Sequence, residues 1–418
     1  MPVLVVNRAF RSTDGEIPVT ENRPLGTTTK GSSTEVSRAS YDSIYSLMDE
    51  SQRLLSSENH RHCICHQYRI PTHDTIEIRR NLDESSAGYG GLMKCGNVWA
   101  CPVCSRKISE QRRDELTRAV DTARGRGDRV VMLTLTHSHG LDDDFVQSRK
   151  TMVKAYSRLT SGRWWKEMTE YFSIYGRIRA LEVTHSYKNG WHIHFHVLLF
   201  LNDTDHDIDY MESNIKGRWS GILNRIGGFA SHERGATITE NQSDIATYVT
   251  KFGTEYTEIG KTESPWTEAH ELAKAAVKVA KDKDSRTPFS LLADSKAGDK
   301  QAGALFVQYV LGMYRQQQLV WSNGLKDDLL NEEEITDQEI ADMPEQEVVA
   351  TVDIRTYRAI GRMGMRGVLL DWAARGEDRK LQTVLVYMEN HTWDKTLSKR
   401  KVRKVNNVQT AQHNGSLG

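Results

Sequence analysis

The sequence has few prolines, few cysteines and no long apolar run. Its 418 residues include eight prolines and five cysteines. No stretch of about 18 consecutive apolar residues occurs, so the sequence predicts no membrane-spanning helix. The amino terminus also lacks the basic and then apolar pattern of a secretory signal peptide. We therefore expect a cytoplasmic protein without a membrane partner.

The chain also lacks a net charge, because 56 Lys and Arg residues balance 56 Asp and Glu residues. A zero total neither favours nor excludes nucleic acid, since the charges are segregated along the chain. Basic residues crowd the stretch 106–129 and the tail 399–404, and an acidic run covers 327–347. A solvated helix face explains the first stretch as well as a DNA-binding surface does. Four of its residues are our candidate DNA contacts: Arg106, Lys107, Arg112 and Arg113.

The cysteines all lie between residues 63 and 104. In a cytoplasmic chain, cysteines this close together indicate metal ligands before disulfides. Cys95, Cys101 and Cys104 supply three thiolates, and Cys63 or Cys65 can complete a tetrahedral zinc site. His62 and His66 flank that pair and stay open as alternatives. A closed site with four protein ligands predicts structural Zn²⁺.

Hydrophobic periodicity predicts an α+β protein. Strands are expected at 129–136, 177–186, 191–201, 348–353 and 381–388, and helices at 106–123, 145–159, 163–171, 243–252, 265–280, 302–318 and 366–375. Five segments follow from this pattern: a poorly ordered segment 1–50, a cysteine-rich zinc-binding segment with a basic helix 51–125, a core 126–260, a helical extension 261–345 and a C-terminal accessory region with a basic tail 346–418.

A histidine-rich strand is the most informative stretch. Side chains alternate along a strand, so His192, His194 and His196 share one face. The Cβ atoms of neighbouring histidines on that face lie about 7 Å apart, a distance from which two rings can converge on one ion. Imidazoles suit several first-row metals, and an added carboxylate shifts the preference toward Mn²⁺ or Mg²⁺.

The preceding turn decides whether Glu182 supplies that carboxylate. In a three-residue loop at 188–190, Tyr187 pairs with Trp191 and Glu182 faces His196. In a two-residue turn at 189–190, Glu182 points to the opposite, apolar face. We favour the first register, because burying a carboxylate in an apolar face is costly.

Several motifs resemble those of one protein family. His194-Phe195-His196 has the histidine–hydrophobic–histidine pattern of the HUH endonucleases, and the wider match resembles the rolling-circle replication initiators of bacterial plasmids and phages. It covers roughly residues 60–345. The matching blocks are Cys95–Cys104, Leu133–Thr136, Leu181–Thr184, the histidine strand, Thr287–Leu292 and Trp321–Lys326.

This resemblance implies an HUH core, in which helices flank a central antiparallel sheet of five strands. It also implies a tyrosine nucleophile in a Tyr-x-x-Lys motif, which Tyr248 and Lys251 match. Tyr256 is the second candidate for the nucleophile. Asp244 stands where some relatives carry a glutamate, and a lysine found directly before the tyrosine in those relatives is absent. Among the cysteines, Cys65 aligns better than Cys63 with a zinc ligand.

The predicted function is to nick one strand at a replication origin and later rejoin it. Tyr248 would form a 5′-phosphotyrosine, with Mn²⁺ or Mg²⁺ held by His194, His196 and Glu182. His192 would be a further ligand or support a ligand, and Asp244 could activate water for a terminating cut. We expect single-stranded origin DNA, a host helicase and a polymerase as partners in a bacterial cytoplasm. The alternatives are an HUH transposase or mobilisation nuclease, and a catalytically inert, zinc-containing DNA-binding repressor.

Overall fold

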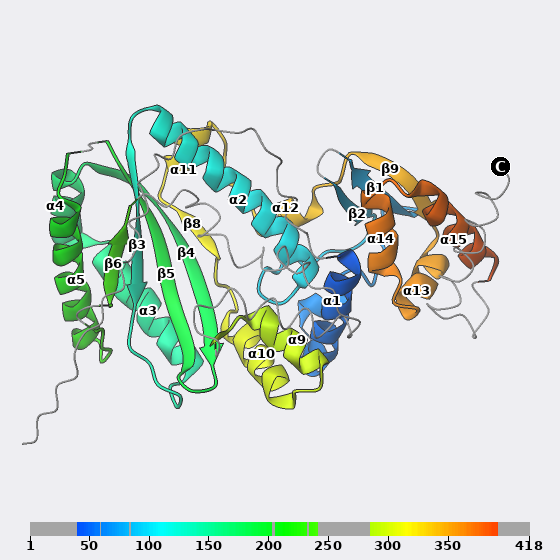
Figure 1. Ribbon diagram of the computed structural model, residues 1–418, viewed down its shortest axis with the longest axis horizontal. Coiled ribbons are helices and arrows are strands. Elements are labelled where there is room, and N and C mark those ends of the chain that lie inside the picture. Colours follow the sequence, from blue (N-terminus) through cyan, green and yellow to red (C-terminus); the bar gives the residue numbers. More distant parts are fainter. Residues whose placement is uncertain are drawn as a thin grey trace, which may run out of the picture. The chain divides into compact units, whose positions relative to one another are not determined.

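The computed structural model describes residues 40–58, 60–82, 85–202, 205–231, 234–240 and 285–391. Within these ranges the protein is α+β, with two antiparallel sheets and helices around them (Figure 1). The basic tail and the helices predicted at 243–252 and 265–280 lie outside the described residues. None of the described helices is long and apolar enough to cross a membrane.

The larger sheet has the strand order β6-β3-β5-β4-β7, and β8 pairs with β4 in addition. All of its ladders are antiparallel, and Figure 1 shows its long strands side by side. The predicted strand at 129–136 is confirmed, and the next begins three residues before its predicted start. The strands are β3 Arg129–Thr136, β4 Ile174–Ser186, β5 Gly190–Leu201, β6 Ala236–Thr239, β7 Ser285–Arg286 and β8 Leu319–Trp321.

Both faces of this sheet are covered by apolar side chains, because successive side chains of β5 belong to two different apolar clusters. Phe195 belongs to the cluster that contains buried residues of α3 and α5. Leu198 and Phe200 belong to the other, with buried residues of α2 and Trp321. The histidines lie on this second face, beyond the apolar contacts with α2. The four helices are α2 Pro102–Gly125, α3 Phe145–Leu159, α4 Gly162–Tyr171 and α5 Ile208–Arg225.

The smaller sheet has the order β2-β1-β9 and joins distant parts of the chain. β1 Ile76–Asn81 pairs with both β2 Ser86–Gly90 and β9 Glu347–Val352. The cysteine-rich segment and the C-terminal accessory region, which we predicted as separate segments, therefore share a sheet. In the described residues up to 391, three helices follow β9: α13 Ile354–Arg362, α14 Arg366–Ala374 and α15 Asp378–Asn390.

Two predictions about secondary structure are wrong, and the helix predicted at 302–318 ends six residues early, at Gly312. The segment 381–388, predicted as a strand, lies inside α15. Its buried residues Leu381, Val384, Leu385 and Met388 follow the helical spacing that the apolar content of this short stretch concealed.

The second error concerns residues 41–50, which we predicted to be poorly ordered. They belong to α1 Tyr41–Leu55, which Ser40 caps and which buries Ile44, Leu47 and Met48. The remaining helices are η1 Ser56–Glu58, η2 Arg61–Ile64, α9 Pro288–Lys296, α10 Lys300–Gly312, α11 Leu325–Leu330 and α12 Asp337–Asp342.

Candidate active site and metal centre

The β4–β5 hairpin places Glu182 on the face of the histidines. Ser186 pairs with Gly190, His185 with Trp191, and Glu182 with His194. The predicted face of Glu182 is therefore confirmed, but the predicted pairing with His196 is wrong by two residues. The loop begins earlier than expected because the Ser186 hydroxyl accepts hydrogen bonds from the backbone N–H groups of residues 188 and 189, both at 3.2 Å.

His196 is held at both ring nitrogens. Its Nε2 forms a short hydrogen bond with the Glu182 carboxylate, and its Nδ1 lies 3.1 Å from the Thr134 hydroxyl. Thr134 is the residue opposite His196 on β3, so the sheet itself places the hydroxyl against the ring. The rings of His194 and His196 are nearly parallel, with centroids 5.9 Å apart. Two imidazoles and one carboxylate therefore gather on one partly buried patch of the sheet.

Burial keeps the neighbouring histidines neutral. It lowers the pKa of His194 to about 4, against a weaker opposing effect of the Glu182 charge. The pKa of His192 falls to about 2, mainly through burial and then through the adjacent imidazoles. A neutral imidazole retains one nitrogen lone pair, which is the form that binds a metal ion.

Two further histidines reach this patch that the sequence analysis did not single out. His139 stacks on His192 with ring centroids 4.4 Å apart, and His137 lies 6.4 Å from His139. Both directly follow β3, whose last residue Thr136 pairs with His194. The sequence places both histidines just after the Leu-Thr-Leu-Thr strand. This position indicates that they lie near the histidine strand only once β3 is known to pair with β5.

The predicted nucleophile lies outside the described residues, as do Asp244, Lys251 and Tyr256. The described chain before them ends with β6 and Glu240. In β6, Thr237 pairs with Thr134, the residue that bonds His196. The described chain before Tyr248 thus ends next to the strand that carries Thr134.

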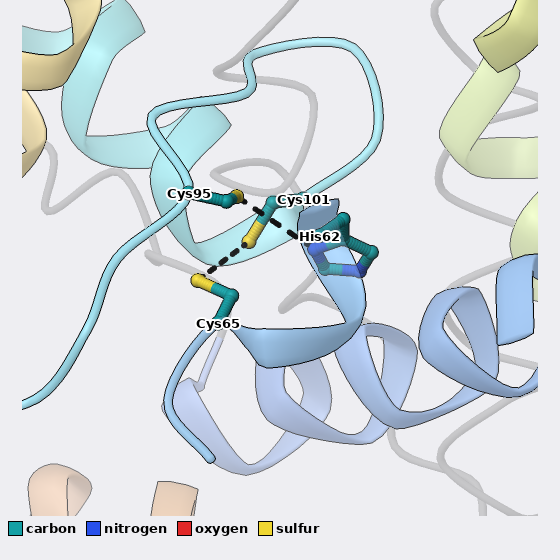
Figure 2. A group of neighbouring side chains, drawn as sticks. All are labelled: His62, Cys65, Cys95 and Cys101. Atoms are coloured by element: carbon teal, nitrogen blue, oxygen red, sulfur yellow. Dashed lines mark hydrogen bonds between the residues drawn. The ribbon is translucent and has the colours of Figure 1, made fainter. Parts of the chain in front are cut away.

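A second group of potential ligands surrounds the start of α2. Figure 2 shows His62, Cys65, Cys95 and Cys101 pointing toward one another, and all four are buried. His62 lies in η2, Cys65 follows it, and Cys101 caps α2. The ligand atoms of these four residues all lie within 4.8 Å of one another. Among the described residues, the ligand atoms of the histidine patch do not lie as close together.

The spacing of the sulfur atoms fits a tetrahedral zinc site. The Sγ of Cys65 lies 3.8 Å from both Cys101 Sγ and Cys104 Sγ, and Cys95 Sγ lies 3.7 Å from Cys104 Sγ. Four thiolates around Zn²⁺ with bonds of about 2.3 Å would be separated by about 3.8 Å. His62 Nδ1 lies 3.8 Å from Cys95 Sγ, so it competes with Cys104 for a place in the ligand set.

Cys63 is not part of this group. It is half-buried, and its Sγ donates to the Gln52 carbonyl at 3.7 Å. Within the group itself, burial raises the pKa of Cys95 and Cys101 well above the usual range. The three other thiols donate toward Cys104 and lower its pKa well below that range. A buried cluster that concentrates negative charge on sulfur is suited to a divalent cation.

The basic stretch of α2 is engaged inside the protein. Arg106 is buried, bonds Glu110 at 3.2 Å and lies over the Tyr41 ring. Arg112, also buried, bonds Glu115 at 2.9 Å. These contacts argue against the predicted DNA contacts at both arginines, because neither guanidinium faces solvent.

The acidic run found in the sequence is a partner of this helix. Four ion pairs join α2 to it in regular antiparallel order: Lys107–Glu345, Arg112–Asp337, Arg118–Glu332 and Arg126–Asp328. Arg113 lies 4.0 Å from Asp114 of its own helix. Lys107 and Arg113 retain part of their side-chain exposure, at 30% and 27%. Most of the positive charge on α2 is therefore balanced within the chain.

Residues 93–226 match the family described as "Replication protein". This match covers about a third of the chain. The predicted resemblance to the rolling-circle initiators is thereby confirmed, and the matched domain includes Glu182, the histidine strand and three of the cysteines.

Curated proteins support the same relationship. The chain is 28% identical over 263 residues to the protein rep of Streptomyces lividans, covering 51% of this chain and 55% of that protein. It is 31% identical to a neomycin resistance protein of Streptomyces cyanogenus, over 27% of this chain and 31% of that one. It is 28% identical to the protein rep of Lentilactobacillus hilgardii, over 25% and 32%. The chain thus spans about half or less of each relative's length. No solved structure matches it significantly.

Proposed function

We propose that this replication protein initiates rolling-circle replication by nicking one strand at an origin and later rejoining it. The observation that carries the proposal is the position of Glu182, opposite His194 and hydrogen-bonded to His196, inside the matched domain. A carboxylate and two imidazoles on one sheet face are ligands that suit a divalent ion for phosphate chemistry.

In this proposal residues 126–260 form an HUH nuclease core. The segment 51–125 would bind zinc, and the segment 261–345 would be a helical extension. The segment 346–418 would be an accessory region, and its strand β9 belongs to the smaller sheet. Single-stranded origin DNA is the proposed substrate in the bacterial cytoplasm, and a host helicase and polymerase are the proposed partners. The names of the two rep proteins to which the chain is similar favour a replication role over a transposase.

His194, His196 and Glu182 would hold Mn²⁺ or Mg²⁺, with His192 beside them. When bound, such an ion polarises a phosphate oxygen and stabilises the charge that develops on it. Thr134 fixes the ring of His196 through its Nδ1, so that Nε2 stays directed at the site. Partners of this kind, which orient a ligand without touching the ion, typically change metal affinity by about 10–100-fold.

The covalent step belongs to Tyr248. Its phenolic oxygen forms a bond to phosphorus as the bond between phosphorus and the 3′ oxygen breaks, leaving a 5′-phosphotyrosine and a 3′ hydroxyl. The phenol loses its proton to solvent, and the 3′ oxygen gains one. Lys251, one helical turn on in the predicted helix, would favour the phenolate. The reverse reaction rejoins the strand, and Asp244 would activate water when the cycle ends with hydrolysis.

The test is to incubate the full chain with single-stranded DNA libraries and Mn²⁺ and to look for a covalent adduct. We expect an adduct that maps by mass spectrometry to Tyr248, is lost in Tyr248→Phe and persists in the matched control Tyr256→Phe. Glu182→Gln should lower the nicking rate by at least about tenfold, since it removes a charged ligand. A wild-type chain that binds DNA but cuts none under any metal would support the repressor instead.

We also propose that the cysteine group binds structural Zn²⁺. The sulfur separations support four thiolate ligands, from Cys65, Cys95, Cys101 and Cys104, and place His62 as the competitor. We expect about one zinc per chain by elemental analysis, lost in Cys65→Ser and kept in the matched variant Cys63→Ser. Comparing Cys104→Ser with His62→Ala then identifies the fourth ligand. Equal zinc contents in all four variants would contradict the site.

A further inference from the structure

Four imidazoles form a continuous cluster beside the pair of Glu182 and His196. His139 stacks on His192 at 4.4 Å between ring centroids, and His192 lies 3.7 Å from His194. His137 lies 6.4 Å from His139. The sheet produces this arrangement, because β3 runs antiparallel to β5 with Thr136 opposite His194, so the chain that leaves β3 passes next to His192. We call His137, His139, His192 and His194 the imidazole cluster.

Two ring nitrogens of this cluster are buried and lack a hydrogen-bond partner among the described residues: His137 Nδ1 and His194 Nδ1. Leaving a buried polar atom unsatisfied costs about 1–3 kcal/mol, so such atoms call for a ligand. A neutral imidazole has a lone pair on one ring nitrogen, which can bind a metal ion.

We propose that the imidazole cluster is a second metal site, distinct from the set His194, His196 and Glu182, and that it selects a late first-row cation such as Ni²⁺. Its donors are nitrogen atoms alone, which suit Ni²⁺, Cu²⁺ and Zn²⁺, whereas the oxygen ligand that favours Mn²⁺ or Mg²⁺ is bonded to His196. His139, His192 and His194 are the ligands, and His137 is the fourth donor. The rings stack in this structure, so they rotate about their Cβ–Cγ bonds to direct nitrogen at one ion.

The two sites share His194. An ion in the imidazole cluster draws this ring away from the Glu182 and His196 side, so that Ni²⁺ inhibits the nicking reaction. This consequence rests on the proposed function, whereas the binding of Ni²⁺ does not. Inhibition would follow from competition for one ligand and requires no other change in the protein.

Ni²⁺ binding to the full, zinc-loaded chain tests the site by titration calorimetry. His139→Phe is the decisive variant, because phenylalanine keeps a ring stacked on His192 and removes both nitrogens. His73→Phe is the matched control, since His73 is exposed and lies in a loop before β1. We expect one Ni²⁺ per wild-type chain, an unchanged affinity in His73→Phe and an affinity at least about tenfold lower in His139→Phe. Equal affinities in all three chains, or no Ni²⁺ binding by the wild type, overturn the site.

A nicking assay then separates this inference from the proposed function. Each variant is compared with its own rate in Mn²⁺ alone, and the half-inhibiting Ni²⁺ concentration should rise about tenfold or more in His139→Phe. Inhibition at the same Ni²⁺ concentration in wild type and His139→Phe contradicts the competition. A chain that binds Ni²⁺ through His139 but never nicks DNA keeps the metal site and removes the proposed function.

Discussion

His185 shows how one buried residue ties the stability of this protein to pH. It lies on β4, 4% exposed, with its ring against Trp191 at 4.7 Å and Tyr187 at 5.5 Å. Burial lowers its pKa to about 4. The unfolded chain has a histidine pKa of about 6.5, so between these values the unfolded state binds more protons. The contribution of the neutral ring is complete above about pH 6.5 and is lost as the pH falls toward 4.

His185→Phe should therefore weaken the pH dependence of stability. Phenylalanine keeps the contact with Trp191 and takes up no proton. The limit is about 1.4 kcal/mol per pH unit for one histidine, so we expect the loss of unfolding free energy between pH 7 and pH 5 to shrink by about 1–2 kcal/mol. Urea unfolding at both pH values measures this difference. The same pH dependence in His185→Phe as in the wild type would refute the argument.

At the scale of single elements, the sequence predicted the bounds of helices and strands better than the contacts between distant elements. β3 and α3 have the predicted bounds, because alternation marks the strand and Asp144 caps the helix. The pairing of Glu182 was missed by two residues, since the Ser186 hydroxyl accepts two backbone hydrogen bonds and the loop begins one residue earlier than predicted. His137 and His139 were missed for another reason: they reach the histidines only through pairing between strands distant in sequence.

The charge runs show the same limit. The sequence reveals a basic helix and an acidic segment about 200 residues later, but not that the two lie against each other. The ion pairs between them, from Lys107–Glu345 to Arg126–Asp328, balance much of the charge of the basic run within the chain. The zero net charge is consistent with this pairing, because the basic run of α2 lies against an acidic run of the same chain.

The ion pairs of α2 predict a specific loss of stability. Glu115 is fully buried and lies 2.9 Å from Arg112 and 3.2 Å from Lys326 of α11. Glu115→Ala would leave the buried Lys326 without its anion and would leave Arg112 with Asp337 alone, which costs about 3–5 kcal/mol. The control Glu332→Ala removes an exposed partner of Arg118 and should cost less than about 1 kcal/mol. Urea unfolding compares the two, and similar small losses would show that Glu115 is not the anchor of α11.

At the scale of the whole described chain, α1 and α14 connect its two ends. Gly367 of α14 packs directly on the backbone of Tyr41 and Asp42, where an added Cβ would overlap both. One turn on, the Asp371 carboxylate accepts hydrogen bonds from the backbone N–H groups of Tyr41 and Asp42, at 2.7 and 3.1 Å. The start of α1 is therefore held by a helix more than 300 residues away.

This contact also bears on the cysteine group, because α1 supports the segment that carries two of its members. Gln52 of α1 donates to the carbonyls of His62 and Cys65, and Ser51 donates to the Ala100 carbonyl beside Cys101. A change that pushes α14 away from α1 should thus loosen the zinc ligands, although it touches none of them.

Gly367→Ala tests this connection. The added methyl group should cost about 1–3 kcal/mol of unfolding free energy, since neither backbone can move aside easily. The control is Gly217→Ala on α5, where no atom lies within 4 Å of the new Cβ and the helix gains from alanine. Zinc transfer to a chromophoric chelator should be faster in Gly367→Ala than in wild type or Gly217→Ala. Faster unfolding with an unchanged rate of zinc transfer would mean that the ligands are held by α2 and their own loops, independently of the distant end of the chain.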